Sequence, residues 1–362
     1  MQVNFEGRLD ELIGSIRPTD PSAEERAWQR LDSLTKPPRS LGVLEQVAAR
    51  VARVQGTDRP EVSRKVIVLA AGDHGVVEEG VSSFPQDVTW QMVANFVAGG
   101  AAINQLADSV GAELRLYDIG VARDISHLPG VRIEKVAMGT ENMARGAAMT
   151  REQAAQAVLI GVDAARDAIA DGATILGTGE MGIGNTTAAS ALTSAFTGAE
   201  PALVVGPGTG LDVDGVRLKV NVVEQALRVN AVDTLDSLGV LAAVGGLEIA
   251  ALAGVVLGAA EGGVCVVSDG FISGAAALSA IRLCPTASEY LFPSHLSVEP
   301  GHAIVLEALA MRPVLALDMR LGEGTGAALA LGIIDSACRM LSGMATFAEA
   351  GVSGSTEAQE IA

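Results

Sequence analysis

The sequence is poor in aromatic residues, cysteine and positive charge, and each shortage excludes a class of protein. Aromatic residues make up 3% of the 362 residues, and the small side chains that predominate instead let helices pack closely and let backbone approach a ligand. The net charge of −18 repels nucleic acid and anionic membranes, so we expect neither as a partner. The three cysteines (Cys265, Cys284 and Cys338) are widely spaced, which argues against a disulfide framework or zinc site and favours reduced thiols.

Long hydrophobic runs are also scarce, and the run at residues 241–260 is the one that resembles a membrane span. It is only just long enough to cross a bilayer. Glu248 lies near its middle, where a carboxylate costs roughly 3 kcal/mol in a membrane, so we predict a buried helix or helix pair instead. The N-terminal residues are acidic and polar, unlike a signal peptide, and we expect a cytoplasmic protein.

The rest of the composition indicates a globular chain with helices at its start. With 49% hydrophobic and 19% charged residues, the chain can bury one large α/β domain and a smaller one. Apolar residues at a helical period predict helices around residues 9–16, 23–34 and 41–54. Pro37 and Pro38 separate the last two segments, because proline ends a helix.

From residue 65 onward, short β-branched runs alternate with glycine-rich turns and helical patterns, which predicts a mainly parallel sheet. The runs lie at residues 65–72, 113–120, 173–180, 202–211, 264–271, 289–296 and 314–321, and the fourth could instead be a loop that approaches a ligand. Polar residues follow most runs, among them Asp73, His74, Asp118, Glu180 and Asp269. Ligands of open parallel sheets bind beyond the carboxyl ends of the strands, so these side chains are expected around one cleft; helix capping is the alternative role.

Two glycine-rich loops are candidates for binding an anion. The loop at residues 176–190 allows close backbone approach, and Asn185 and Thr186 can cap the helix that follows it. It lacks the Lys-Ser or Lys-Thr of a P-loop. In the loop at residues 206–213, successive N–H groups could hold a phosphate, with Lys219 supplying the balancing charge. The alternatives are a tight connection for the first loop and an ordinary turn for the second.

Glu323 lies between glycines, directly after a predicted strand and at the start of a helix. The helix N-terminus favours its carboxylate, whereas burial beside an aromatic base would raise its pKa toward a value useful for a general base. Capping is the alternative role. Arg320, three residues earlier, could meet an anion or pair with an acid.

The spacing of His295, Glu299 and His302 could suggest a metal site. Pro300 and Gly301 interrupt the helical face that would align these groups, so we expect a substrate or subunit contact and no metal. In the segment at residues 71–105, small and amide side chains beside Phe84, Val88 and Met92 would suit a flat, mostly apolar base, although amphipathic packing explains them equally well.

These motifs recur in the order found in one family. The stretches that carry the resemblance are LTKPPRSLGVLE (34–45), AGDHGV (71–76), GEMGIGNTT (179–187), GPGTGLD (206–212), SDGFISGAAAL (268–278), SHLSVEPGH (294–302) and LDMRLGEGTGAAL (317–329). They cover nearly the whole chain. The sequence resembles the nicotinate-nucleotide–dimethylbenzimidazole phosphoribosyltransferase family of cobalamin lower-ligand synthesis.

The resemblance implies an α/β fold: a Rossmann-like, mainly parallel sheet with helices on both faces, plus a small helical domain formed by both chain ends. Residues 1–62 and 325–362 would form the small domain, and residues 63–324 the large catalytic domain. The resemblance also implies a homodimer with active sites near the subunit interface. No cofactor is expected, and no metal is required because no pyrophosphate leaves.

The implied reaction moves the phosphoribosyl group of nicotinate mononucleotide to 5,6-dimethylbenzimidazole or a related base, with inversion at C1′. By resemblance, Glu323 is the general base and Glu180 steadies positive charge at C1′. The residues implied in binding the nucleotide are Gly182, Gly208, Thr209, Gly210, Lys219, Asp269, Ser297 and Arg320. Ser83 and Gln91 are implied in binding the base.

Two other functions stay open on the residues alone. A transferase that uses phosphoribosyl pyrophosphate and Mg²⁺ usually has paired acids followed by Thr-Thr-Gly after a strand, and the sequence has no such run. A nucleotide- or base-binding protein without activity could keep the glycine loops, but it has no need of both Glu180 and Glu323. The preferred acceptor also stays open among dimethylbenzimidazole, benzimidazole, adenine and phenols.

Overall fold

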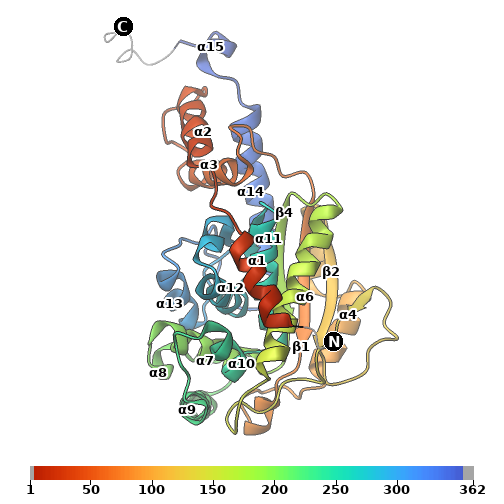
Figure 1. Ribbon diagram of the computed structural model, residues 1–362. Coiled ribbons are helices and arrows are strands. Elements are labelled where there is room, and N and C mark those ends of the chain that lie inside the picture. The colour runs from red at the N-terminus through yellow and green to blue at the C-terminus, as the bar shows by residue number, and fades with distance from the viewer. Residues whose placement is uncertain (1–3, 354–362) are drawn as a thin grey trace. The chain divides into compact units, whose positions relative to one another are not determined.

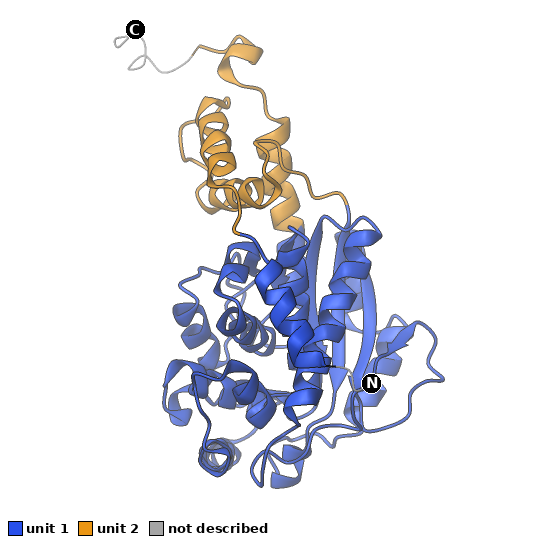
Figure 2. Ribbon diagram, viewed as in Figure 1, with its two compact units in different colours: residues 1–17, 64–331 blue, residues 18–63, 332–362 orange. Residues whose placement is uncertain are grey.

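The computed structural model describes residues 4–353, which belong to two compact units (Figure 2). Unit 1 comprises residues 1–17 and 64–331, and unit 2 comprises residues 18–63 and 332–362. These bounds differ from the expected ones at both chain ends. Helix α1 (Phe5–Ser15) belongs to unit 1 because it packs on α6 (Arg151–Ala170). The start of α14 (Thr325–Gly343), up to residue 331, also belongs to unit 1.

Unit 1 is built on a six-stranded sheet in the order β3-β2-β1-β4-β5-β6, and every neighbouring pair is parallel. The strands are β1 (Lys65–Gly72), β2 (Ala112–Gly120), β3 (Val131–Ile133), β4 (Ile175–Met181), β5 (Cys265–Ser268) and β6 (Leu291–Pro293). This order is that of a Rossmann-type sheet, with its reversal between β1 and β4. The expected Rossmann-like, mainly parallel fold is confirmed.

Two predicted strands are wrong, and one short strand was missed. The run at residues 202–211 begins as helix α8 (Pro201–Val204), because Pro201 at the first helical position presets a helical φ. Its remaining residues form a loop, which was the alternative for this run. The run at residues 314–321 forms only an isolated bridge between Leu315 and His295, and Asp318 there has a φ of 53°. The edge strand β3 is too short to show an alternating pattern.

The other helices of unit 1 cover the sheet and its carboxyl edge. They are α4 (Val88–Val97), α5 (Ala102–Ser109), α7 (Asn185–Thr197), α9 (Val213–Asn230), α10 (Ser237–Val244), α11 (Leu247–Glu261), α12 (Phe271–Leu283) and α13 (Pro300–Ala308), with 3₁₀ helices η1 (Gly75–Glu79) and η2 (Pro285–Tyr290). Figure 1 shows α6 and α11 side by side. They pack this closely because Gly161 and Gly254 lack a Cβ, which would overlap the backbone of the facing helix.

The hydrophobic run at residues 241–260 forms the predicted helix pair, α10 and α11. Glu248 is fully buried in the first turn of α11, where His74 is its partner. Among residues 4–353, no helix is long and apolar enough to cross a membrane. The hydrophobicity that made this run resemble a membrane span is therefore explained by its burial in the core of unit 1.

Unit 2 is helical. It contains α2 (Pro21–Ser33), α3 (Val43–Gln55), the second part of α14 and α15 (Phe347–Ala350). The Arg30 guanidinium joins its two chain segments by donating to the backbone carbonyls of Leu341 and Met344, both at 2.9 Å. Lys36 and Glu45 form a buried ion pair at 2.9 Å.

Candidate active site

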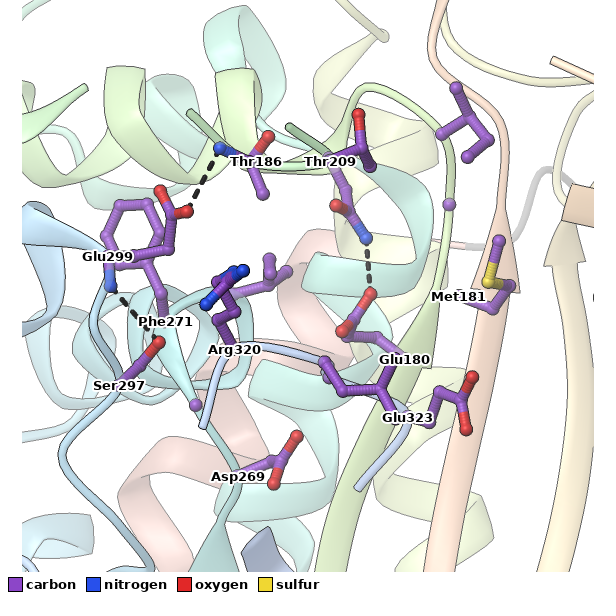
Figure 3. Close-up of a pocket in the computed structure, with 18 of the residues that line it drawn as sticks. Glu180, Met181, Thr186, Thr209, Asp269, Phe271, Ser297, Glu299, Arg320 and Glu323 are labelled. Atoms are coloured by element: carbon purple, nitrogen blue, oxygen red, sulfur yellow. Dashed lines mark hydrogen bonds between the residues drawn. The ribbon is translucent and has the colours of Figure 1, made fainter. Parts of the chain in front are cut away.

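A cavity of about 670 Å³ opens beyond the carboxyl ends of β4, β5 and β6 (Figure 3). Its walls come from the segments that follow these strands, from the loop at residues 208–210, and from residues 320–323 before α14. The expected convergence of distant polar residues on one cleft is confirmed for Glu180 and Asp269. Asp73, His74 and Asp118 lie at the same sheet edge but do not line the cavity.

Glu180 ends β4 and is almost fully buried. The side-chain amide of Asn185 donates to its Oε2. Burial raises the pKa of Glu180 to about 8, helped by the negative charges of Asp269 and Glu248 and opposed by the hydrogen bond from Asn185. At neutral pH this carboxyl therefore holds a proton.

Glu323 lies at the other side of the same cavity, in a loop with unusual backbone geometry. Its φ is 64°, between Gly322 at 85° and Gly324 at 91°. The loop is held against β4 so closely that a Cβ at Gly179 would lie 2.9 Å from the carbonyl carbon of Glu323. Figure 3 shows the carboxyl groups of Glu180 and Glu323 diverging, with that of Glu323 on the side of Met181.

The surroundings of the Glu323 carboxyl suit a proton acceptor. Its Oε2 has no hydrogen-bond partner among the described residues. Burial raises the pKa of Glu323, the nearby charge of Asp269 raises it further, and the backbone N–H of Ile103 in the first turn of α5 opposes the shift. A carboxylate with a raised pKa and a free oxygen is a stronger base than one in water.

Asp269 lines the cavity, and its oxygens are largely occupied by backbone. Oδ2 accepts from Gly324 N at 3.1 Å, and Oδ1 accepts from Gly326 N at 2.7 Å and Ala327 N at 3.0 Å. Burial raises its pKa to about 6, and these N–H groups oppose the shift. Asp269 thus fastens the start of α14 and the loop that carries Glu323.

The opposite corner of the cavity offers cationic and backbone groups. Gly208, Thr209 and Gly210 line it, and Gly208 N donates to Glu299 Oε1 at 3.0 Å. Lys219 of α9 does not line the cavity but lies directly behind this loop. It is fully buried and donates to Thr186 Oγ1 at 2.7 Å. Burial lowers its pKa to about 8, opposed by the charge of Glu299, so the amine is charged at neutral pH.

Arg320 and Ser297 also line the cavity, as predicted, along with Gly182. Arg320 is exposed and forms no ion pair with the residues that the structure describes, so its charge is available to a ligand. Ser297 Oγ accepts from Glu299 N at 3.3 Å, and Ser297 N donates to His302 Nδ1 at 2.9 Å. Burial lowers the pKa of His302 to about 3, which keeps this ring neutral. Over residues 4–353, no cluster of three or more His, Cys, Asp or Glu side chains could hold a metal.

The remaining wall of the cavity is apolar and is formed by Phe84, Val88 and Met92 together with Met181 and Ile183. Ser83 and Gln91, predicted to contact the base, are exposed and do not line the cavity. They stand next in sequence to Phe84 and Met92, which do.

Sequence analysis missed the roles of several lining residues. The predicted capping by Asn185 and Thr186 is wrong, since the N-cap of α7 is Gly184 and no side chain caps it. These two side chains instead turn to Glu180 and Lys219. Glu299 was considered as a metal ligand or as part of a substrate or subunit contact, and its acceptance of a hydrogen bond from the glycine loop was missed. Its position after a predicted strand was the one signal in the sequence.

Comparison with known proteins assigns the chain to a family of transferases. A family described as phosphoribosyltransferase matches residues 16–352. The nicotinate-nucleotide–dimethylbenzimidazole phosphoribosyltransferase of Geobacter metallireducens is 53% identical over 344 residues, covering 95% of this chain and 98% of that protein. Its counterpart in Chloroflexus aggregans is 51% identical, covering 97% and 99%.

A solved structure extends the similarity to the fold. The crystal structure of the enzyme of that name from Thermus thermophilus superposes with a TM-score of 0.88 at 50% identity, covering 93% of this chain and 100% of that chain. Identity of this degree over nearly the full length of each protein leaves no large region unmatched. The chain belongs to the nicotinate-nucleotide–dimethylbenzimidazole phosphoribosyltransferase family.

Proposed function

We propose that this protein transfers the 5-phosphoribosyl group of nicotinate mononucleotide to 5,6-dimethylbenzimidazole or a related base, in assembly of the cobalamin lower ligand. The products are nicotinate and an α-ribazole phosphate. The observation that carries the proposal is one cavity holding two diverging buried carboxyls, Glu180 and Glu323, between an apolar wall and a glycine loop that has the buried Lys219 behind it. The apolar wall suits the acceptor base, and the glycine loop suits the phosphate of the nucleotide.

The acceptor base occupies the apolar wall in this proposal. Phe84, Val88, Met92 and Met181 offer a flat base the surface that it needs. Glu323 Oε2 takes the proton from one imidazole nitrogen while the other nitrogen attacks C1′. Ser83 and Gln91 contact the base at the mouth of the cavity.

The nucleotide occupies the other side. Its phosphate lies against the loop at residues 208–210, where Gly208 N and Gly210 N already donate to Glu299 and Pro207. Thr209 therefore supplies the contact from this loop, with Lys219 and Arg320 balancing the charge. Glu180 lies near the sugar and stabilises positive charge at C1′ as the bond to the pyridine nitrogen breaks. The pyridinium is already a cationic leaving group, so no acid has to protonate it, and attack from the opposite face inverts C1′.

We also infer a homodimer. Leu296, Val298, Leu317 and Leu321 are exposed on the segments that form the cavity walls, and side chains of this kind are enriched where subunits meet. Size-exclusion chromatography with light scattering should give twice the mass of the 36.9 kDa chain. A monomer at micromolar concentration would contradict the inference.

The test of the activity is an assay of the purified protein with nicotinate mononucleotide and a panel of bases. Benzimidazoles should be converted to nucleotides with release of one nicotinate for each product. Turnover that instead requires phosphoribosyl pyrophosphate and Mg²⁺ would favour the rival transferase. Tight nucleotide binding without turnover on any base would favour a binding protein.

A further inference from the structure

His74 and Glu248 form a buried pair that the mechanism above does not use. His74 follows β1 and Glu248 lies in the first turn of α11, and His74 Nε2 is 2.5 Å from Glu248 Oε1. Both side chains are at most 1% exposed, and neither lines the cavity. Because withdrawing two charges from water costs several kcal/mol for each ion, such a pair is a poor way to gain stability alone.

The pair packs against the turn at residues 182–184, which connects Glu180 to its hydrogen-bond partner Asn185. A Cβ at Gly182 would lie 2.9 Å from Glu248 Oε1 and 3.4 Å from His74 Cδ2, and a Cβ at Gly184 would lie 3.3 Å from His74 Cβ. This turn starts after Glu180 and ends at Asn185, whose amide donates to Glu180. Thr89 Oγ1 of α4 holds the same turn by accepting from Ile183 N at 3.0 Å.

The charges in this region are also coupled. The pKa of His74 is raised, because the attraction of Glu248 and Asp73 outweighs the effect of burial. Glu248 in turn is one of the negative charges that raise the pKa of Glu180. His74 thus contacts Glu248 directly, and the turn at residues 182–184 lies between this pair and the cavity.

We propose that His74 and Glu248 are positioning residues: their contact fixes the turn at residues 182–184 and thereby holds Asn185 and Glu180 in register with the sugar. The part of this inference that concerns turnover rests on the proposed function of Glu180. The part that concerns the turn does not, and the two are measured separately.

The experiment uses full-length Glu248→Gln and His74→Gln, so that failure of one to fold leaves the other. Asp118→Asn is the matched control: Asp118 is a fully buried carboxylate at the end of the neighbouring strand β2, paired with Lys135 at 2.9 Å and without contact to the turn. Hydrogen exchange of the peptide covering residues 176–190 and steady-state kinetics are measured on all three and on the unmodified protein.

We expect faster exchange at residues 182–185 in both Gln variants, and a kcat lowered roughly tenfold to a hundredfold, because small misplacements of reacting groups have effects of that size. The KM for the base should change little, and the pH profile should move with the altered charge near Glu180. Asp118→Asn should keep the exchange rate of this peptide and keep kcat within about twofold of the unmodified protein. This should hold even if its melting temperature falls as much as those of the two Gln variants.

Unchanged exchange at the turn overturns the proposal, and so does an equal loss of kcat in Asp118→Asn, which would indicate a general loss of stability. Faster exchange with normal kcat also overturns the role in the reaction, provided that Glu180→Gln is itself impaired. If Glu180→Gln keeps full activity, the proposed function of Glu180 fails, and the exchange result still decides whether the pair holds the turn.

Discussion

The carboxyl edge of the sheet has two halves that use similar residues for different ends. Beyond β1 and β2, two buried acids have a basic partner, since Asp118 meets Lys135 and Glu248 meets His74, while a third, Asp73, accepts from the backbone N–H of Ala122. Beyond β4, Glu180 has only an amide partner, and before α14 one oxygen of Glu323 has none among the described residues. The first half is closed and the second lines a cavity. The difference indicates that reactivity depends on which acids lack a cation, rather than on burial alone.

Among substitutions that test this difference between the two halves, the largest loss of activity is expected at Glu323. Glu323→Gln keeps the shape of the side chain but removes the proton acceptor, so kcat should fall by about a hundredfold to ten-thousandfold. Nucleotide affinity, measured by calorimetry, should stay near that of the unmodified protein. Unchanged turnover would remove Glu323 from the mechanism.

The next effect concerns Lys219, the buried cation behind the glycine loop of the cavity. Lys219→Met should raise the KM for the nucleotide by roughly thirtyfold or more, since loss of a buried charge contact costs about 2 kcal/mol or more. Arg217→Met on the same helix is the matched control, because that side chain is exposed and pairs only with Asp214. In the unmodified protein the KM should rise above pH 8, where Lys219 loses its charge. Equal effects of the two substitutions would contradict the phosphate role.

A smaller effect is expected on the pH dependence of nucleotide binding, through the ionisation of Glu180. Its pKa of about 8 means that the empty site is protonated at pH 7, and a cationic pyridinium favours the ionised form. Nucleotide binding should therefore release a proton, and affinity should rise with pH up to about 8, above which the loss of charge on Lys219 lowers it.

Calorimetry at pH 7 in two buffers of different ionisation enthalpy measures this release, and Glu180→Gln should abolish it. A binding enthalpy independent of the buffer in the unmodified protein would show that Glu180 does not change its ionisation when the nucleotide binds.

The smallest effect is expected at the two exposed residues next in sequence to the apolar wall, Ser83 and Gln91. Ser83→Ala and Gln91→Ala each remove one exposed hydrogen-bonding group, so the KM for the base should change only a few-fold. Their KM for the nucleotide serves as the internal control. A loss of kcat comparable to that of Glu323→Gln would contradict a peripheral position for these residues.

The sequence predicted elements well where the pattern was local. β1 is buried along its whole length and apolar after Lys65, and the run at residues 241–260 formed the expected helix pair. Patterns failed where one residue changed the backbone, as Pro201 did in starting α8. The placement of Glu323 in the cavity followed from glycines on both sides of an acid after a predicted strand.

Other site features could not be predicted from spacing. The N-terminal position of Asn185 in α7 suggested a cap, but the turn at residues 182–184 directs its amide to Glu180. That turn depends on His74 and Glu248, which are far apart in the sequence and meet only in the folded chain. The buried position of Lys219 behind Thr186 likewise depends on how α9 packs against α7.

The stereochemistry of the product tests the central claim most directly. Nicotinate mononucleotide and 5,6-dimethylbenzimidazole are incubated with the protein, and the anomeric configuration of the nucleotide formed is read by proton NMR. A single attack on C1′, with the acceptor beside Glu323 and the leaving pyridinium on the opposite face, predicts the α anomer alone. A β-linked product would require two displacements or a different arrangement of substrates, and would contradict the account.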